Sequence, residues 1–316
     1  MGFLTNIWPF FLILRPKNLA LIVFTMTVLQ YGVIHRITTG SPVLDLQGFI
    51  LFVLTTLLIA GSGNLVNDIF DRDTDKINKP DKTYIPRFIS LKQAWTYYLF
   101  LVFTGFGLAL YIAFTTGHLA DMWIYPVAVS GLYFYAKKFK SSILVGNILV
   151  SAFISLVWGI LFYVEFSGRN DSLYQAPQHI TILQTLGLPY MLFAFLINLT
   201  REIVKDLEDM EGDKKNGVQT YPIKFGVKKT KNLLNLLTLC LVGGIGYWLF
   251  FTKMTEGFEN RFFYLIFIIL PLILVLTKTR MATLKKDYHF LSSVLKLIMV
   301  FALIGMIFIT KNGILL

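Results

Sequence analysis

Nine apolar segments constrain the fold of this chain more than any other feature of its sequence. Each is close to the ~20 residues that an α-helix needs to cross a bilayer. The sequence shows no alternation typical of strands, and only helices and closed barrels can span a membrane. We therefore expect an all-α, multi-pass membrane bundle of nine transmembrane helices with a central cavity, forming a single domain over residues 1–316. The expected spans are 18–36, 47–66, 94–115, 121–136, 143–164, 182–199, 231–252, 261–277 and 291–310.

A polar stretch, 64–75, directly follows the apolar run 49–60. On a helix that turns about 100° per residue, four of its side chains fall within an arc of roughly 60°, whereas Asp73 falls on the opposite side. Three carboxylates on one face repel one another, and a helix tolerates this mainly when a cation lies among them. The four residues on the shared face are Asn64, Asp68, Asp71 and Asp75.

A second stretch, 202–213, repeats this arrangement 138 residues later. Charged helix ends beside a membrane are common, but a four-position pattern at a constant offset indicates a repeated site. We therefore predict two acidic helices that face each other and share divalent metal ions. The repeated positions are Glu202, Asp206, Asp209 and Asp213, and Asn67 and Lys205 occupy matching places between them.

The distribution of basic residues predicts the orientation in the membrane. Of the 29 Lys and Arg residues, 23 fall on one side of the expected spans. By the positive-inside rule, that side is cytoplasmic and carries the amino terminus and both acidic stretches, so the protein is expected in the cell membrane. This topology accounts for the net charge of +11, and no nucleic-acid partner is expected.

Carboxylates at this spacing suit Mg²⁺, which takes one or two of them and completes its shell with water and phosphate oxygens. The four histidines do not cluster, so a zinc site is not expected. Basic residues near both stretches would neutralise a diphosphate, and the surrounding apolar helices leave room for a long tail. A diphosphate head with an apolar tail is a prenyl diphosphate. The sequence therefore favours Mg²⁺-dependent ionisation of an allylic diphosphate and prenyl transfer to a lipophilic acceptor.

Several residues outside the acidic positions are candidates as well. Tyr135 and Lys138 follow the fourth span and could reach a diphosphate, although a positive-inside anchor explains the same basic cluster. Asn147 and Asn198 lie at membrane depth, where each could be an interhelical hydrogen-bonding residue or part of the site. Asn198 falls on the face of the second stretch.

With these motifs in place, the sequence resembles the UbiA-type intramembrane prenyltransferases, a family with nine transmembrane helices and two aspartate-rich cytoplasmic motifs. The resemblance covers nearly the whole chain. It begins with Asn67-Asp68-x-x-Asp71-x-x-x-Asp75. The second motif is similar to that of the digeranylgeranylglyceryl phosphate synthase branch, which transfers a geranylgeranyl group to the hydroxyl of geranylgeranylglyceryl phosphate with Mg²⁺. This motif reads Arg201-Glu202-Ile203-Val204-Lys205-Asp206-x-x-Asp209-x-x-Gly212-Asp213 and continues to Gly217, Thr220, Pro222, Ile223 and Gly226.

The resemblance implies roles for individual residues of this chain. The metal-holding and catalytic carboxylates would be Asp68, Asp71, Asp75, Asp206, Asp209 and Asp213. The residues that contact the diphosphate or orient ligands would be Asn64, Asn67, Arg72, Lys79, Lys82, Arg201 and Lys205, and Lys138, Asn198 and Glu202 complete the expected substrate-binding set.

Two alternatives remain open at the level of sequence. The acceptor could be an aromatic ring, as in quinone, tocopherol or chlorophyll biosynthesis, because the second motif is partly shared with enzymes of those pathways. A glyceryl phosphate acceptor needs additional cations, which Lys137, Lys138, Lys214 and Lys215 could supply. The other alternative is a cation-coupled membrane transporter with carboxylates at membrane depth.

Overall fold

The computed structural model describes residues 8–37, 43–78, 83–167, 186–251 and 258–311, and every regular element within them is a helix. Seven of these helices are long and apolar enough to cross a bilayer. The all-helical membrane class expected from the apolar segments is therefore confirmed for the described part of the chain. The seven candidate spans are Pro16–Ile34, Leu46–Ile77, Leu91–Thr116, Val145–Glu165, Tyr221–Phe251, Phe258–Met281 and Lys285–Ile309.

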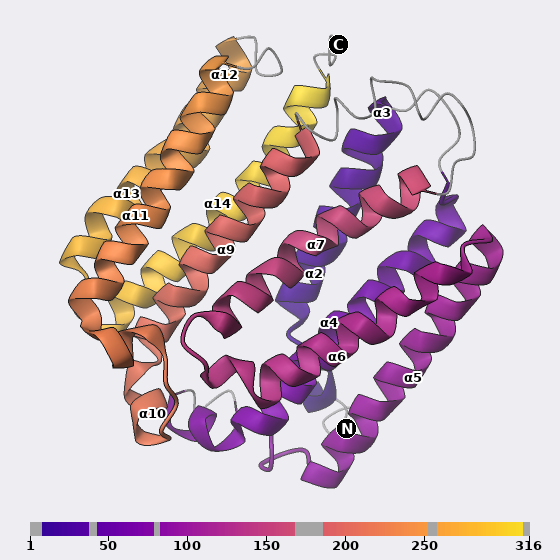
Figure 1. Ribbon diagram of the computed structural model, residues 1–316, viewed down its shortest axis with the longest axis horizontal. Helices are drawn as coiled ribbons and strands as arrows, with labels where there is room; N and C mark the ends of the chain where they lie inside the picture. The colour runs from indigo at the N-terminus through magenta and orange to yellow at the C-terminus, as the bar shows by residue number, and fades with distance from the viewer. Residues whose placement is uncertain (1–7, 38–42, 79–82, 168–185, 252–257, 312–316) are drawn as a thin grey trace.

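Figure 1 shows how the described helices are arranged along the chain. The first half of the chain contains α2 (Pro16–Thr27), η1 (Val28–Ile34), α3 (His35–Ile37), α4 (Leu46–Asn78), α5 (Leu91–Thr116), η3 (Leu119–Trp123), α6 (Ile124–Lys137), η4 (Phe139–Ser141) and α7 (Val145–Ser167). The second half contains α9 (Leu188–Glu208), α10 (Met210–Lys215), α11 (Tyr221–Phe251), α12 (Phe258–Tyr264), η7 (Leu265–Ile269), α13 (Leu270–Met281) and α14 (Lys285–Lys311).

Two of the nine expected spans do not appear among the seven long apolar helices. The expected span 121–136 corresponds to α6, which has 14 residues and begins only after the short 3₁₀ turn η3. The expected span 182–199 corresponds to α9, a helix of 21 residues whose second half carries the acidic stretch and is therefore less apolar. Residues 182–185 lie outside the described residues.

The helices pack side by side in one bundle, with α9 in contact with α7, α11 and α14, and α4 in contact with α5 and α6 (Figure 1). The larger hydrophobic cluster brings together residues of η1, α7, α9, α11, α13 and α14. A smaller cluster joins the middle of α4 to the start of α5, with Ile85 and Ile89 from the segment between them. The bundle thus has two apolar cores, one of them under the first acidic stretch.

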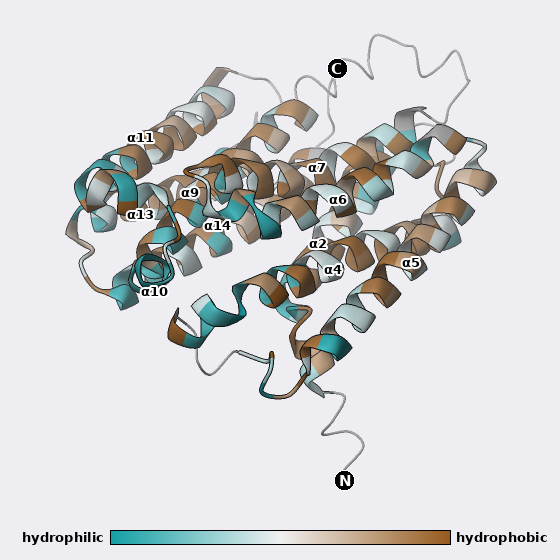
Figure 2. Cartoon of the chain, turned by 60° about the horizontal axis from the view of Figure 1, so that its bottom comes forward, coloured by the Kyte–Doolittle hydropathy of each residue, from teal (hydrophilic) through white to brown (hydrophobic). Residues whose placement is uncertain are grey.

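Hydrophilic residues gather at one end of the bundle, on α10 and the neighbouring end of α4 (Figure 2). The 33 residues of α4 make a helix about 50 Å long, which exceeds the ~30 Å hydrocarbon core of a bilayer. Its acidic last turns therefore extend past the apolar part of the helix. Two glycines adopt a positive φ at which a side chain would be strained: Gly217, at 71°, lies between α10 and α11, and Gly226, at 83°, forms a kink within α11.

Candidate active site

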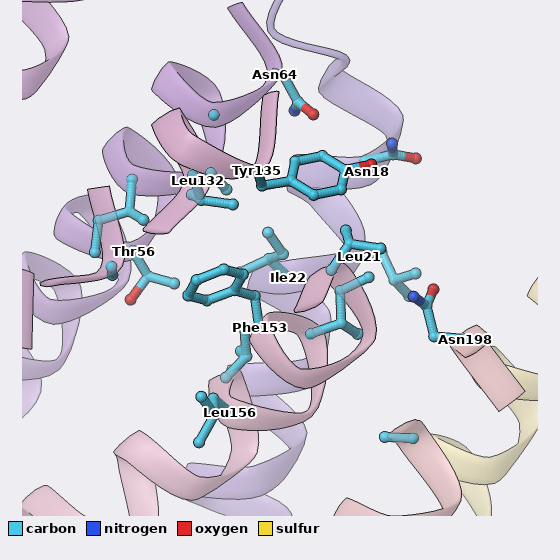
Figure 3. A pocket seen from close by; sticks show the side chains of 18 of the residues that line it. Asn18, Leu21, Ile22, Thr56, Asn64, Leu132, Tyr135, Phe153, Leu156 and Asn198 are labelled. Atoms are coloured by element: carbon cyan, nitrogen blue, oxygen red, sulfur yellow. The ribbon is translucent and has the colours of Figure 1, made fainter. Parts of the chain in front are cut away.

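A pocket of about 1700 Å³ opens among α2, α4, α6, α7, α9 and α14. Its body is apolar, with Leu21, Ile22, Phe153 and Leu156 pointing into it, and Asn18, Asn64 and Tyr135 lie at its polar rim (Figure 3). Pockets for drug-sized ligands measure about 300–1,000 Å³, so this one is large enough for a long lipid tail as well as a head group.

The first acidic stretch lies on α4, an unbroken helix, as the spacing predicts. Its face that lines the pocket carries Asn64, Asn67, Asp68, Asp71 and Asp75. The Asp73 side chain is 61% exposed and pairs with Lys76 and Arg72 outside the pocket. The prediction that Asp73 points away from the other aspartates is confirmed.

Two of these carboxylates are paired with cations from distant parts of the chain. Arg15 Nη2 lies 2.5 Å from Asp68 Oδ1, and Lys140 Nζ forms an ion pair with Asp71 Oδ2. Asn67 Nδ2 donates a second hydrogen bond to Asp71 at 2.5 Å. Burial by itself would lower the pKa of Lys140, but the charge of Asp71 outweighs it and holds that pKa well above its usual value.

The second acidic stretch does not form one helix, and that prediction is wrong. α9 ends at Glu208, Asp209 adopts a non-helical conformation (φ −96°, ψ 2°), and α10 begins at Met210. Negative side chains destabilise a helix carboxyl terminus and stabilise an amino terminus. The break places Glu211 and Asp213 in the first turn of a new helix, where their charge is favourable.

Charges of the second stretch are balanced mainly by close neighbours. Glu202 accepts hydrogen bonds from Arg201 Nη1 at 3.1 Å and Lys205 Nζ at 2.8 Å. Burial would raise the pKa of Glu202, but these two cations lower it to about 2. Asp206, which lies beyond the expected span 182–199, accepts one hydrogen bond from Asn147 Nδ2 at 2.9 Å. Burial, reinforced by the charges of Glu202 and Asp213, raises the pKa of Asp206 to about 7 despite that bond.

The two acidic stretches meet. α10 lies against α4, and all six candidate aspartates line the same pocket. Within the described residues, no three His, Cys, Asp or Glu side chains are close enough to form a ready-made metal cluster, and Arg15 and Lys140 pair with Asp68 and Asp71 of α4.

The donor set fits Mg²⁺. Every candidate ligand is an oxygen, the ligand type that this ion prefers. The buried Oδ1 atom of Asn67, beside Asp71, has no hydrogen-bond partner among the described residues and remains available as an oxygen donor.

Not every residue expected at the site is placed there. Arg72 is one position from the pocket-lining face of α4 and pairs with Asp73 instead. Lys138, directly after α6, is exposed and does not line the pocket. Three further lysines are also exposed and outside the pocket lining: Lys137, Lys214 and Lys215. Lys79 and Lys82 lie outside the described residues. The remaining expected residues, Asn64, Asn67, Asn198, Arg201, Glu202 and Lys205, line the pocket.

The pocket also contains polar residues that the spacing of the acidic stretches does not reveal. Lys140 reaches Asp71 because η4 turns the chain back toward α4 after α6 ends. Arg15 directly precedes α2, and its charge next to an X-Pro sequence gives no indication of a partner 53 residues away. Asn18 and Lys296 line the pocket as well. The one usable signal was Lys296 itself, a lone cation within an apolar span.

Aromatic side chains line the deep part of the pocket. Trp158 stacks on Tyr190 with ring centroids 5.4 Å apart and on Phe162 at 5.8 Å. Phe153 faces the centre of the pocket (Figure 3). Aromatic faces attract cations and exclude water, so this wall suits an allylic cation and its hydrocarbon tail.

The sequence of the chain is similar to the sequences of known prenyltransferases. Residues 36–306 match the sequence profile of the UbiA prenyltransferase family. The chain is 31% identical over 303 residues to digeranylgeranylglyceryl phosphate synthase of Methanosphaera stadtmanae, an alignment that covers 94% of this chain and 97% of that enzyme.

Solved structures show the same fold. A structure of a digeranylgeranylglyceryl phosphate synthase superposes with a TM-score of 0.63 at 25% identity, covering 98% of this chain and 99% of the other. A UbiA homologue from Archaeoglobus fulgidus, bound to GPP and Mg²⁺, superposes with a TM-score of 0.55 at 18% identity. The superposition covers 94% of this chain and 99% of the homologue.

Proposed function

The chain belongs to the UbiA prenyltransferase family, and we propose that it transfers a geranylgeranyl group from its diphosphate to the free hydroxyl of geranylgeranylglyceryl phosphate. It is a multi-pass integral membrane prenyltransferase. The observation that carries the proposal is the meeting of two acidic stretches, 138 residues apart in sequence, on one pocket with an apolar body. Relatives named as digeranylgeranylglyceryl phosphate synthases, similar over most of the chain, support the choice of acceptor.

The six aspartates of the two stretches would hold Mg²⁺, and the Mg²⁺ would in turn bind the diphosphate of the substrate. When bound, Mg²⁺ neutralises the charge that develops on the departing diphosphate. Lys205 and Arg201, which line the pocket beside these aspartates, would bind the diphosphate oxygens. Asn64 and Asn67 would orient ligands, and Asn198 lies one turn from Glu202 on the same wall.

The reaction then proceeds in a dry, apolar cavity. The allylic C–O bond breaks, and the diphosphate leaves with the electron pair. The oxygen of the acceptor hydroxyl forms a new C–O ether bond to the allylic carbon, and its proton passes to the released diphosphate. Trp158, Tyr190 and Phe153 exclude the water that would otherwise capture the cation.

We further propose that residues 1–316 form one intramembrane domain in which α6 and α9 join the seven long apolar helices. The nine spans would then surround the pocket as a central cavity. The amino terminus and both acidic stretches would face the cytoplasm, and a reporter fused after Leu316 would read as non-cytoplasmic.

The acceptor is tested with purified protein, Mg²⁺, labelled geranylgeranyl diphosphate and a panel of acceptors. We expect an ether product with geranylgeranylglyceryl phosphate and none when Mg²⁺ is chelated. Transfer to a hydroxybenzoic acid but not to the glyceryl phosphate would assign the aromatic-acceptor reaction instead. Absence of any prenyl diphosphate turnover would contradict the proposal and favour a transport role.

A further inference from the structure

A second group of polar side chains lines the pocket beside the acidic stretches. Lys296 Nζ on α14 donates a hydrogen bond to Asn18 Oδ1 on α2 at 2.9 Å, across 278 residues of sequence. Both side chains are half-buried and line the pocket. Asn18 lies at the polar rim, near Tyr135 (Figure 3).

This group carries an excess of positive charge. Lys17 and Arg201 also line the pocket, and both are close enough to Lys296 for their like charges to act on it. Glu202 pairs with Arg201, but within the described residues no carboxylate forms an ion pair with Lys17 or Lys296. The buried Nε of Arg201 has no hydrogen-bond partner in the described part of the chain. Three cations that share one carboxylate in a partly apolar pocket favour binding of an anion.

The group borders the metal-binding stretches but is distinct from them. Arg15, two residues before Lys17, pairs with Asp68, and Arg201 adjoins Glu202. In the described part of the chain, Lys17, Asn18 and Lys296 form no hydrogen bond or ion pair with the six aspartates. A glyceryl phosphate acceptor fits this arrangement of cations, because its free hydroxyl and its phosphate are carried by adjacent carbon atoms. A phosphate held here would bring the reacting hydroxyl next to the diphosphate end of the pocket.

We propose that Lys17, Asn18 and Lys296 form the subsite for the phosphate monoester of the acceptor, with Arg201 between this subsite and the diphosphate. The inference rests on the proposed function and deepens it, because a phosphate subsite selects a lipid phosphate over an aromatic acceptor. Lys296 supplies a charge-assisted hydrogen bond to the phosphate, and Asn18 orients the ammonium group. These residues take the place of Lys137, Lys138, Lys214 and Lys215, which do not line the pocket.

The test compares Lys296→Gln, Lys296→Arg and wild type with two acceptors, geranylgeranylglyceryl phosphate and its dephosphorylated counterpart. We expect Lys296→Gln to raise the KM for the phosphorylated acceptor about 10- to 100-fold and to leave the KM for the dephosphorylated acceptor and for geranylgeranyl diphosphate within about twofold. Lys296→Arg should restore most of the loss. Lys286→Gln, an exposed lysine on the same helix, is the matched control and should match wild type.

Each contrary outcome has a separate meaning. A rise in the KM for geranylgeranyl diphosphate would show that Lys296 serves the donor, and an equal loss with both acceptors would show a structural role. Either result overturns the subsite.

Equilibrium binding of the same two acceptors to wild type and Lys296→Gln in nanodiscs separates the subsite from the proposed function. If wild type binds the phosphorylated acceptor more tightly and Lys296→Gln loses that preference, the subsite stands even without turnover, and the proposed reaction alone fails. If wild type binds both acceptors equally, the subsite is wrong even if transfer occurs.

Discussion

The two acidic stretches have the same spacing and different structures. Residues 64–75 continue one helix, whereas 202–213 are divided at Asp209 between α9 and α10. In the first stretch Asp68 and Asp71 form ion pairs with Arg15 and Lys140, which are distant from them in sequence. In the second stretch Glu202 pairs with Arg201, the residue directly before the stretch, and with Lys205 inside it.

The position of charges relative to the helix ends explains the difference. α4 has Lys76 in its last turn, where a positive charge is favourable. In the second stretch the break at Asp209 places Glu211 and Asp213 in the first turn of α10, where negative charge is favourable, and Lys214 and Lys215 in its last turn. Equal spacing therefore produces a shared face only where the backbone stays helical, and the six aspartates are brought together by packing of α10 against α4.

The largest test of this comparison concerns the unbroken helix. Asp71→Asn should reduce kcat/KM for the prenyl diphosphate by about 100-fold or more, because Asp71 lines the pocket. Asp73→Asn, on the exposed face of the same helix, should remain within about twofold of wild type. Steady-state kinetics at saturating Mg²⁺ measure both. Equal losses would mean that the face of α4 does not determine function.

The second test concerns the divided stretch. Asp209→Asn should cost about 10- to 100-fold in kcat/KM, because Asp209 lines the pocket. Glu211→Gln should have little effect, since the Glu211 side chain is 80% exposed and pairs with Lys215. If the two variants lost activity equally, the break at Asp209 would not distinguish site residues from surface residues.

A third test uses the raised pKa of Asp206. Below pH 7 the carboxyl binds a proton, and that proton competes with Mg²⁺. The Mg²⁺ concentration for half-maximal activity should therefore rise up to about tenfold per pH unit as the pH falls from 7 to 6, and level off above pH 8. Asp206→Asn should need more Mg²⁺ and show a flatter profile. A wild-type requirement that is constant from pH 6 to 8 would contradict this role of Asp206.

The smallest expected effect is on stability. Without divalent ions, Lys140→Gln leaves the charge of Asp71 uncompensated and should lower Tm by about 3–6 °C. Added Mg²⁺ should recover most of the loss, because it replaces the missing positive charge. Lys138→Gln is the control and should keep the wild-type Tm, since Lys138 is exposed outside the pocket. Thermal unfolding in detergent with and without Mg²⁺ measures the shifts, and equal Tm values for all three proteins would exclude the Lys140–Asp71 pair as a stabilising contact.

Much of the fold was predictable because it depends on local chemistry. Apolar runs near 20 residues require helices in a bilayer, and seven of them form long apolar helices. Two expected spans are not among these long apolar helices. α6 begins only after a 3₁₀ turn, and the second half of α9 carries charged residues. The face of α4 was predictable for a similar reason, since helical spacing places Asp68, Asp71 and Asp75 together and Asp73 apart.

The partners of the acidic residues were less predictable. Lys138 and Lys140 are indistinguishable as cations after a span, but a single turn of η4 decides that Lys140 meets Asp71. Arg72 is adjacent to Asp71 in sequence and still turns to the outer face of α4. The choice of Lys140 over Lys138 depends on the direction of the backbone after α6 ends, which residue spacing does not encode.

The sequence by itself determined that this chain is a helical membrane protein with two matched acidic stretches, because hydrophobic length and helical periodicity act within each segment. Only the tertiary structure decided that α10 meets α4, that Arg15 and Lys140 stand among the aspartates, and that Lys296 joins Asn18 at the pocket. These contacts join residues 53 to 278 positions apart. They arise from the packing of whole helices, whose relative placement depends on all their neighbours at once.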